Sequence, residues 1–197
     1  METRRTGIVL RLHSADAAQG WTPPEAREVP SRTVVLPEGA GLDERAATAA
    51  ATIEELGTPA HVLATGEDGA VAVRLATTRP ELVASLLLAD CDPVTRWGDV
   101  TPELPVVAVP ALVLCAARDG GTGPGGTSGI AASQRLAGEI DNGVFVLIDH
   151  ADPPAHATRP LSVGAWIGSF VAIVNGLAAL APRVVPASVP TPHGEEQ

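Results

Sequence analysis

The sequence of 197 residues contains no lysine, and its basic side chains are thirteen arginines spread along the chain. At a formal net charge of −10, it offers no cluster of positive charge that could neutralise a phosphate backbone. We therefore expect no nucleic-acid partner. Charged residues make up only 18% of the chain and hydrophobic residues 45%, which is enough apolar material to bury a core and excludes disorder as the main state.

Cysteine is also scarce. Cys91 and Cys115 lie in separate apolar stretches without the paired spacing of a zinc site, so we expect buried free thiols rather than a disulfide framework. The first ten residues contain no long apolar run and no small-residue cleavage site, so the sequence predicts no secretory signal and a cytoplasmic protein. Residues 120–127 are rich in glycine but lack the lysine of a phosphate-binding loop, which predicts a connector and no cofactor.

Short apolar runs alternate with helical patterns along the chain. In residues 42–56 the apolar positions recur every three or four residues, which places them on one face of a helix, and residues 69–78 and 132–140 follow similar patterns. This alternation predicts one α/β domain over residues 1–181: a mostly parallel, twisted sheet of about six strands with helices on both faces and right-handed crossovers. The predicted strands are residues 7–13, 33–36, 61–64, 83–89, 111–116 and 144–148.

Two segments near the C-terminus need separate interpretations. Residues 161–181 carry no charge and are long enough to span a bilayer, but their serines, asparagine and glycines, and their place as the last helix of an α/β unit, favour a helix packed on the sheet. A core helix, or a helix with one face left for a second copy in a homodimer, is preferred to a membrane span. Residues 182–197 are proline-rich and acidic and predict a flexible tail.

The stretch HVLATGEDGAVAVRLATTRPELVASLLLAD, residues 61–90, resembles the nucleophile-elbow region of the α/β-hydrolase superfamily, in which a strand leads through G-x-S-x-G into a small-residue helix. His13-Ser14 resembles the start of the family's oxyanion loop, residues 110–119 resemble the strand that delivers the acid, and residues 146–160 resemble the segment that delivers the histidine. The resemblance covers about residues 7–175 and implies a three-layer domain. The connection after Asp90 is too short for the family's usual cap domain.

The sequence resembles the strands and loops of that family but does not retain its catalytic residues. An ungapped alignment places Ala64-Thr65-Gly66-Glu67-Asp68 on G-x-S-x-G, so that Gly66 stands where the nucleophile is expected. Pro153 stands where the resemblance implies the general-base histidine, and only Asp119 matches its expected place. A Ser-His-Asp mechanism needs a hydroxyl to attack and an imidazole to accept its proton. We therefore expect no hydrolysis by this triad.

Candidate site residues are those that follow the predicted strands, because ligands bind beyond the carboxyl ends of a parallel sheet. If chemistry occurs, Glu67 or His150 would act as base, with His156 as the alternative histidine, and Asp119 would orient a histidine. The backbone N–H groups of Ser14 and Glu67 would form an oxyanion pocket. Close carboxylates could also form an acid–base pair or hold Ca²⁺ or Mg²⁺, although we expect no metal. The expected ligand contacts are His13, Ser14, Gly66, Asp68, Asp92 and Trp97.

Three functions remain open at this point. The favoured one is a pseudoenzyme or non-hydrolytic binding protein for a small molecule that bears a carbonyl or acyl group. The alternative is an enzyme of specialised metabolism, a cyclase, lyase or isomerase that acts by proton transfer on a carbonyl compound such as a polyketide. The least favoured is a hydrolase with relocated catalytic residues.

Overall fold

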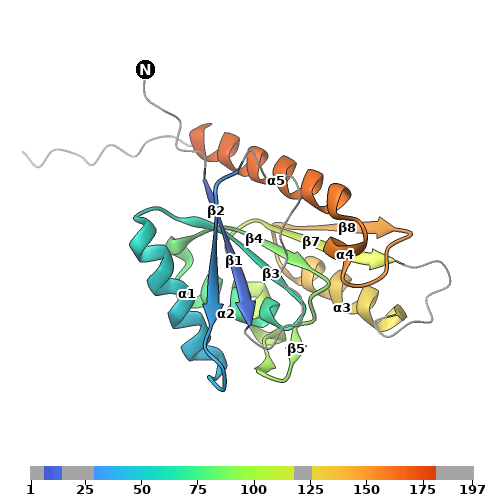
Figure 1. The fold of residues 1–197 in the computed structure, drawn as a ribbon, viewed down its shortest axis with the longest axis horizontal. Helices are drawn as coiled ribbons and strands as arrows, with labels where there is room; N and C mark the ends of the chain where they lie inside the picture. The colour runs from blue at the N-terminus through green and yellow to red at the C-terminus, as the bar shows by residue number, and fades with distance from the viewer. Residues whose placement is uncertain (1–6, 15–28, 118–125, 181–197) are drawn as a thin grey trace, which may run out of the picture.

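The fold is a six-stranded parallel sheet flanked by helices on both sides (Figure 1). The structure, a computed structural model, describes residues 7–14, 29–117 and 126–180. Its strands run in the spatial order β2-β1-β3-β4-β7-β8, with every neighbouring pair parallel. The six strands are β1 (Ile8–Ser14), β2 (Ser31–Leu36), β3 (Ala60–Thr65), β4 (Val83–Ala89), β7 (Ala111–Ala117) and β8 (Gly143–Asp149). The predicted sheet is thereby confirmed, with shifts of one or two residues at the strand ends.

The helices divide between the two faces of the sheet. Helices α1 (Leu42–Leu56), α2 (Asp68–Thr78) and α3 (Gly126–Glu139) cover one face, and α5 (Pro160–Leu180) crosses the other, preceded by the single turn α4 (Ala155–Thr158) (Figure 1). Two apolar clusters match these layers. One joins the inner faces of α1, α2 and α3 to the sheet, and the other joins the inner face of α5 to the opposite side. The three-layer domain expected from the sequence is confirmed.

Burial explains why the central strands read as unbroken apolar runs. All seven residues of β7 are buried, and so are six of the seven residues of β4, because both strands have helices on each face and a strand on each side. Strand β2, at one edge, alternates instead between exposed and buried positions over its last residues.

The connection from β4 to β7 is short and contains no cap domain. It forms a small antiparallel hairpin, β5 (Val94–Thr95) with β6 (Gly98–Asp99), followed by the 3-10 helix η3 (Thr101–Val106). Neither the hairpin nor η3, nor the 3-10 turn η2 (Pro80–Leu82), was predicted from the sequence. Glu103 of η3 accepts two hydrogen bonds from Arg74 of α2, at 2.9 and 2.7 Å, which fixes the connection against the domain. The hairpin tip is thereby held near the carboxyl end of the sheet.

The switch in strand order determines where a site can form. The chain passes from β1 outward to β2 and then returns past β1 to β3 and the remaining strands, so the connections diverge between β1 and β3. In open parallel sheets ligands bind beyond the carboxyl ends of the strands at such a point. Here those ends are Ser14 and Thr65, and the turn into α2 follows directly.

Candidate functional site

The turn between β3 and α2 has the backbone of a nucleophile elbow without a nucleophile. Gly66 has a φ of +56°, in the left-handed region where side chains other than glycine are strained by about 1–2 kcal/mol. In the α/β-hydrolase pattern the nucleophilic serine occupies a similarly sharp strand-to-helix turn. A Cβ atom at Gly66 would meet no atom within 4 Å, so a side chain here would project into open space. The position is shaped for a projecting side chain, and the sequence supplies none.

A buried carboxylate occupies the donor that the oxyanion pocket would need. Asp68, the first residue of α2, accepts a hydrogen bond from the backbone N–H of Ser14 at 3.0 Å and another from the Ser14 hydroxyl. Both residues are buried. The expectation that the Ser14 N–H serves a ligand oxygen is therefore corrected, because the protein's own carboxylate already uses that donor.

This contact follows directly from the sequence. Asp68 stands at the second glycine of the G-x-S-x-G pattern, where the family has no side chain at all. Since β1 and β3 are neighbours, the end of β1 and the turn after β3 lie side by side, and the added carboxylate reaches across to Ser14. The aspartate in the turn thus occupies the backbone N–H of Ser14.

Arg45 of α1 is the third member of this network. It was not among the residues predicted from the sequence. Its side chain is fully buried on α1, donates to the Ser14 hydroxyl at 2.8 Å and to the Ala40 carbonyl at 3.0 Å, and lies 3.7 Å from the centre of the Trp97 ring. The Ser14 hydroxyl thus bridges the Arg45 guanidinium and the Asp68 carboxylate. The sequence feature that could have revealed Arg45 is its position within the apolar stripe of residues 42–56, where a charged side chain needs a buried partner.

Trp97 covers this network from the tip of the β5–β6 hairpin. Its ring lies between two guanidinium groups, with Arg45 at 3.7 Å and Arg96 at 4.2 Å from the ring centre. Arg96 also forms an ion pair with Glu67 at 2.7 Å, on a partly exposed part of the surface. Glu67, expected as a base, therefore holds the hairpin to the elbow, and Trp97, expected as a ligand contact, stacks on the protein's own arginines.

The carboxylates beyond β4 each have their own donors. Asp90, with a φ of +53°, accepts hydrogen bonds from the backbone N–H groups of Ala116 at 2.7 Å and Ala155 at 2.6 Å, and so ties together β4, β7 and α4. Asp92 accepts a hydrogen bond from the backbone N–H of Val94 at 2.8 Å, which forms the turn into the hairpin. The geometry assigns these two carboxylates to the loop structure.

Two further groups near Asp90 have shifted acidity. Burial, with smaller contributions from Asp90 and Asp68, raises the pKa of the Cys91 thiol well above its ordinary value, so this cysteine is a poor nucleophile. Burial also lowers the pKa of His156, and the nearby Asp90 only partly offsets the effect. His156 is thus a buried, neutral histidine beside a carboxylate whose two oxygens already accept backbone hydrogen bonds.

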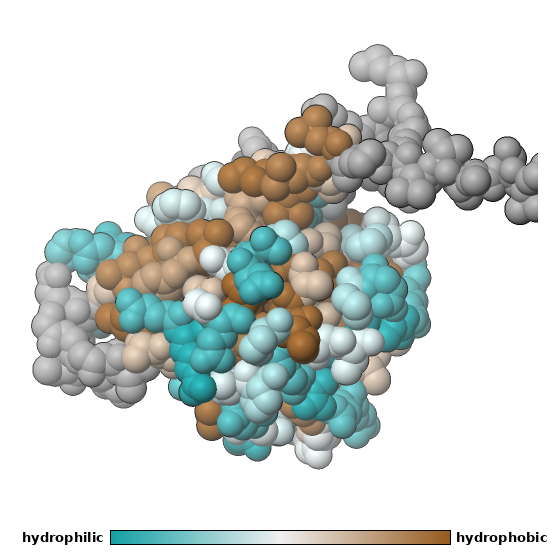
Figure 2. All heavy atoms as spheres, turned by 180° about the vertical axis from the view of Figure 1, so that it is seen from behind, coloured by the Kyte–Doolittle hydropathy of each residue, from teal (hydrophilic) through white to brown (hydrophobic). Residues whose placement is uncertain are grey.

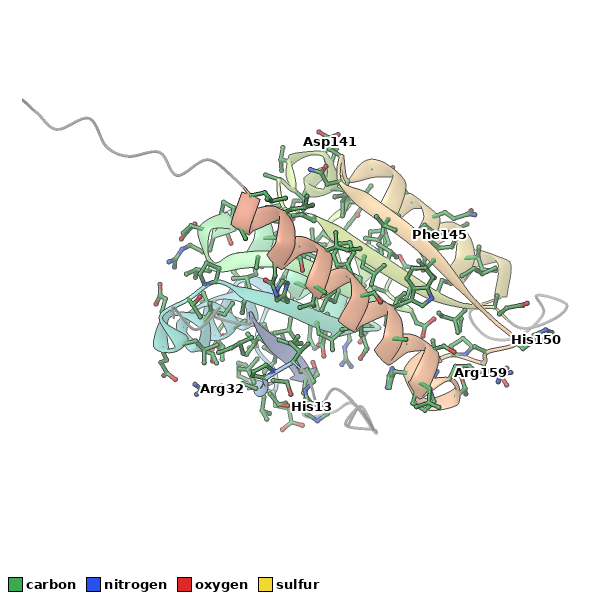
Figure 3. The ribbon with its side chains drawn as sticks, turned by 90° about the horizontal axis from the view of Figure 1, so that it is seen from above. His13, Arg32, Asp141, Phe145, His150 and Arg159 are labelled. Atoms are coloured by element: carbon green, nitrogen blue, oxygen red, sulfur yellow. The ribbon has the colours of Figure 1, made fainter. Side chains whose placement is uncertain are left out.

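The remaining predicted site residues are not brought together. His13 and Ser14 are adjacent in β1 and therefore point to opposite faces of the sheet. His150 lies on the surface beyond β8, with its Nε2 atom 3.5 Å from the Asp149 carboxylate, and Figure 3 shows it far from His13. Asp119, the glycine-rich segment up to residue 125, and the tail 182–197 lie outside the described residues. Within the described ranges there is no group of three or more acidic, histidine or cysteine side chains placed to hold a metal ion.

Comparison with known proteins supports the fold. No model of a known protein family matches the sequence, and no curated protein matches it. Solved structures do match. A thermophilic esterase from Thermogutta terrifontis superposes with a TM-score of 0.70 at 16% identity, covering 86% of this chain and 91% of the esterase.

Two further structures extend the match. An α/β-hydrolase enzyme from a lagoon-sediment metagenome gives a TM-score of 0.69 at 11% identity, covering 85% of this chain and 91% of its own. A membrane phospholipase A, a bacterial virulence factor, superposes with a TM-score of 0.67 at 16% identity, covering 86% of this chain and 80% of the phospholipase. The similarity at these identities extends to the fold, and the chain has the α/β-hydrolase fold.

Proposed function

We propose that this protein is a pseudoenzyme, an α/β-hydrolase-fold protein that acts by binding and not by hydrolysis. The observation that supports this function best is the Asp68 carboxylate on the Ser14 backbone N–H. Hydrolysis of an ester creates a negative oxygen that must be stabilised by such donors. Here the donor is occupied, and a second negative charge would develop beside a fixed carboxylate.

The size of this effect is enough to weaken catalysis strongly. Two unit charges 4 Å apart repel by about 4 kcal/mol at an effective dielectric constant of 20, which is nearly a thousandfold in rate. The absence of a side chain at Gly66 adds to this, because no covalent acyl intermediate can form there. The elbow and the oxyanion donor are therefore both unsuited to hydrolysis.

The filled donor also bears on the ligand. A small molecule with a carbonyl or acyl group, as the sequence suggested, would have to displace Asp68 from Ser14 or bind elsewhere. On the hairpin side, Trp97 stacks on Arg45 of the same network, and Arg96 forms a partly exposed ion pair with Glu67. We therefore favour a role in which the domain binds a partner through its outer surface.

Labelling with a fluorophosphonate probe, together with turnover of a short p-nitrophenyl ester, tests the proposal. The full chain would be compared with Gly66→Ser/Pro153→His and with the same variant carrying Asp68→Gly. We expect no labelling and no turnover of the wild type. At a temperature where circular dichroism shows both variants to be folded, the triple variant should be more active than the double variant. Asp92→Gly is the matched control, because it removes a carboxylate from the neighbouring turn. Added to the double variant, it should not increase the activity. Labelling of the wild type would overturn the proposal.

A further inference from the structure

Helix α5 presents two different flanks beside its buried stripe. On one flank the Asn175 side chain lies 3.2 Å from Nε2 of His61 on β3, so this flank faces the interior strands of the sheet. At 100° per residue the opposite flank faces β8. That flank carries the helix's large apolar side chains, whereas the Asn175 flank carries mainly glycine and alanine. The residues of the β8-facing flank are Trp166, Phe170, Ile173 and Leu177, with Leu180 at the end of the helix.

Strand β8 continues this apolar surface along the edge of the sheet. In the described part of the chain it pairs only with β7, so its other edge carries unpaired backbone groups. Natural proteins protect such edges with lysine, proline or bulges. Residues 143–148 of β8 contain no charge and no proline, and their register with β7 is regular. Val144, which shares a face of β8 with Val146 and therefore points to the α5 side, is 44% exposed, whereas Leu147 shares the opposite face with Phe145. Val146 of β8 and Phe170 of α5 both pack against the apolar cluster on this side of the sheet.

The exposed area is comparable to one side of a stable protein interface. Ile173 and Leu177 are about 60% exposed and Trp166 is 46% exposed. Together with Leu180 and Val144, these side chains expose roughly 600 Å² of apolar surface, against about 800 Å² per partner in a standard interface and about 300–600 Å² for the largest patch on a typical monomer. Figure 2 shows the corresponding brown surface along the side of the molecule where α5 lies.

We propose that this α5–β8 surface is the interface of a homodimer. About a two-fold axis, β8 would pair antiparallel with β8 of a second copy, and the apolar flank of each α5 would cover the partner's edge. A strand satisfies the free backbone groups of β8, which a lipid surface cannot do. The net charge of −10 also opposes binding to an anionic bilayer, although α5 is long and apolar enough to cross a membrane by composition alone.

Sedimentation equilibrium of the full chain tests this interface. We expect a dimer for the wild type and for Ala172→Glu, because Ala172 is exposed on the flank of α5 away from β8. Ile173→Glu and Val144→Lys should each weaken dimerisation by about a hundredfold or more, because each places a charge in the apolar contact. Ala172 and Ile173 are neighbours on one helix, so the pair separates a loss of the interface from a general loss of helix stability.

Hydrogen exchange of the wild type provides a second readout that needs no variant. Amides of β8 should gain protection as protein concentration rises through the dissociation constant. A wild type that remains monomeric at about 100 μM would overturn the proposal. So would a dimer that Ile173→Glu leaves intact, or a monomer that floats with phosphatidylcholine vesicles and loses this binding in Ile173→Glu. None of these outcomes depends on the result of the labelling experiment.

Discussion

Removal of the Asp68 carboxylate is expected to destabilise the domain strongly, because Asp68 is the anionic end of a buried charged network. The Arg45 guanidinium is fully buried, and the Ser14 hydroxyl joins it to Asp68. Asp68→Ala would delete two charge-assisted hydrogen bonds and leave Arg45 without a counter-charge. Breaking a buried pair in this way costs about 3–5 kcal/mol. For a domain of this size that corresponds to a fall of about 10 °C in Tm.

Urea unfolding followed by circular dichroism would measure this loss. Asp92→Ala is the matched control, because its carboxylate is exposed and accepts one backbone hydrogen bond in a turn, so it should cost less than about 1 kcal/mol. The double variant Arg45→Leu/Asp68→Ala should recover part of the stability, since a buried pair replaced by apolar groups is often tolerated. A loss below about 1 kcal/mol for Asp68→Ala, or simple additivity with Arg45→Leu, would refute the network as described.

Two further predictions follow from the packing. Burial lowers the pKa of His61, only partly offset by its hydrogen bond with Asn175, so the unfolded chain binds protons more readily than the folded one. The free energy of unfolding should therefore be fully retained above about pH 6.5 and fall as pH drops through the lowered pKa, by up to about 1.4 kcal/mol per pH unit. His61→Gln should flatten this slope in urea titrations between pH 7.5 and 5, and an unchanged slope would contradict the assignment. Gly69→Ala would place a Cβ atom 2.6 Å from Cβ of Cys91 and should cost about 1–3 kcal/mol. As a control, the new Cβ atom of Gly66→Ala meets no other atom, so this variant should lose only about 1–2 kcal/mol through backbone strain. A thermal melt in which Gly69→Ala leaves the Tm unchanged would contradict the predicted clash.

Local patterns were sufficient to predict the sheet and most helices. The strand runs and the helix over residues 42–56 depend on side-chain periodicity, which a single segment contains in full. The hairpin at the β4–β7 connection was missed because its strands have two residues each and no alternating pattern. The bounds of the domain and of the tail at residues 182–197, and the cytoplasmic location, stay predictions.

The candidate site was predicted less well than the fold. The sequence located Ser14, Gly66, Asp68 and Trp97 at the carboxyl end of the sheet, because strand ends follow from the strand pattern. It did not reveal which partner each side chain has. Glu67 was expected to act in catalysis, yet its carboxylate is held by Arg96 at the tip of the unpredicted hairpin.

The sequence by itself determined the order of strands and helices and the loss of the nucleophile at Gly66, since both are properties of a continuous stretch of chain. Only the tertiary structure decided what fills the site, because Asp68, Ser14 and Arg45 come from three elements that meet after the sheet has formed. It also decided which flank of α5 remains uncovered. The helix is apolar on nearly every side, so its sequence could not distinguish the buried stripe from the flank beside β8. In the fold, the burial of Val163, Ile167, Val171 and Val174 and the contact of Asn175 with His61 fix its rotation.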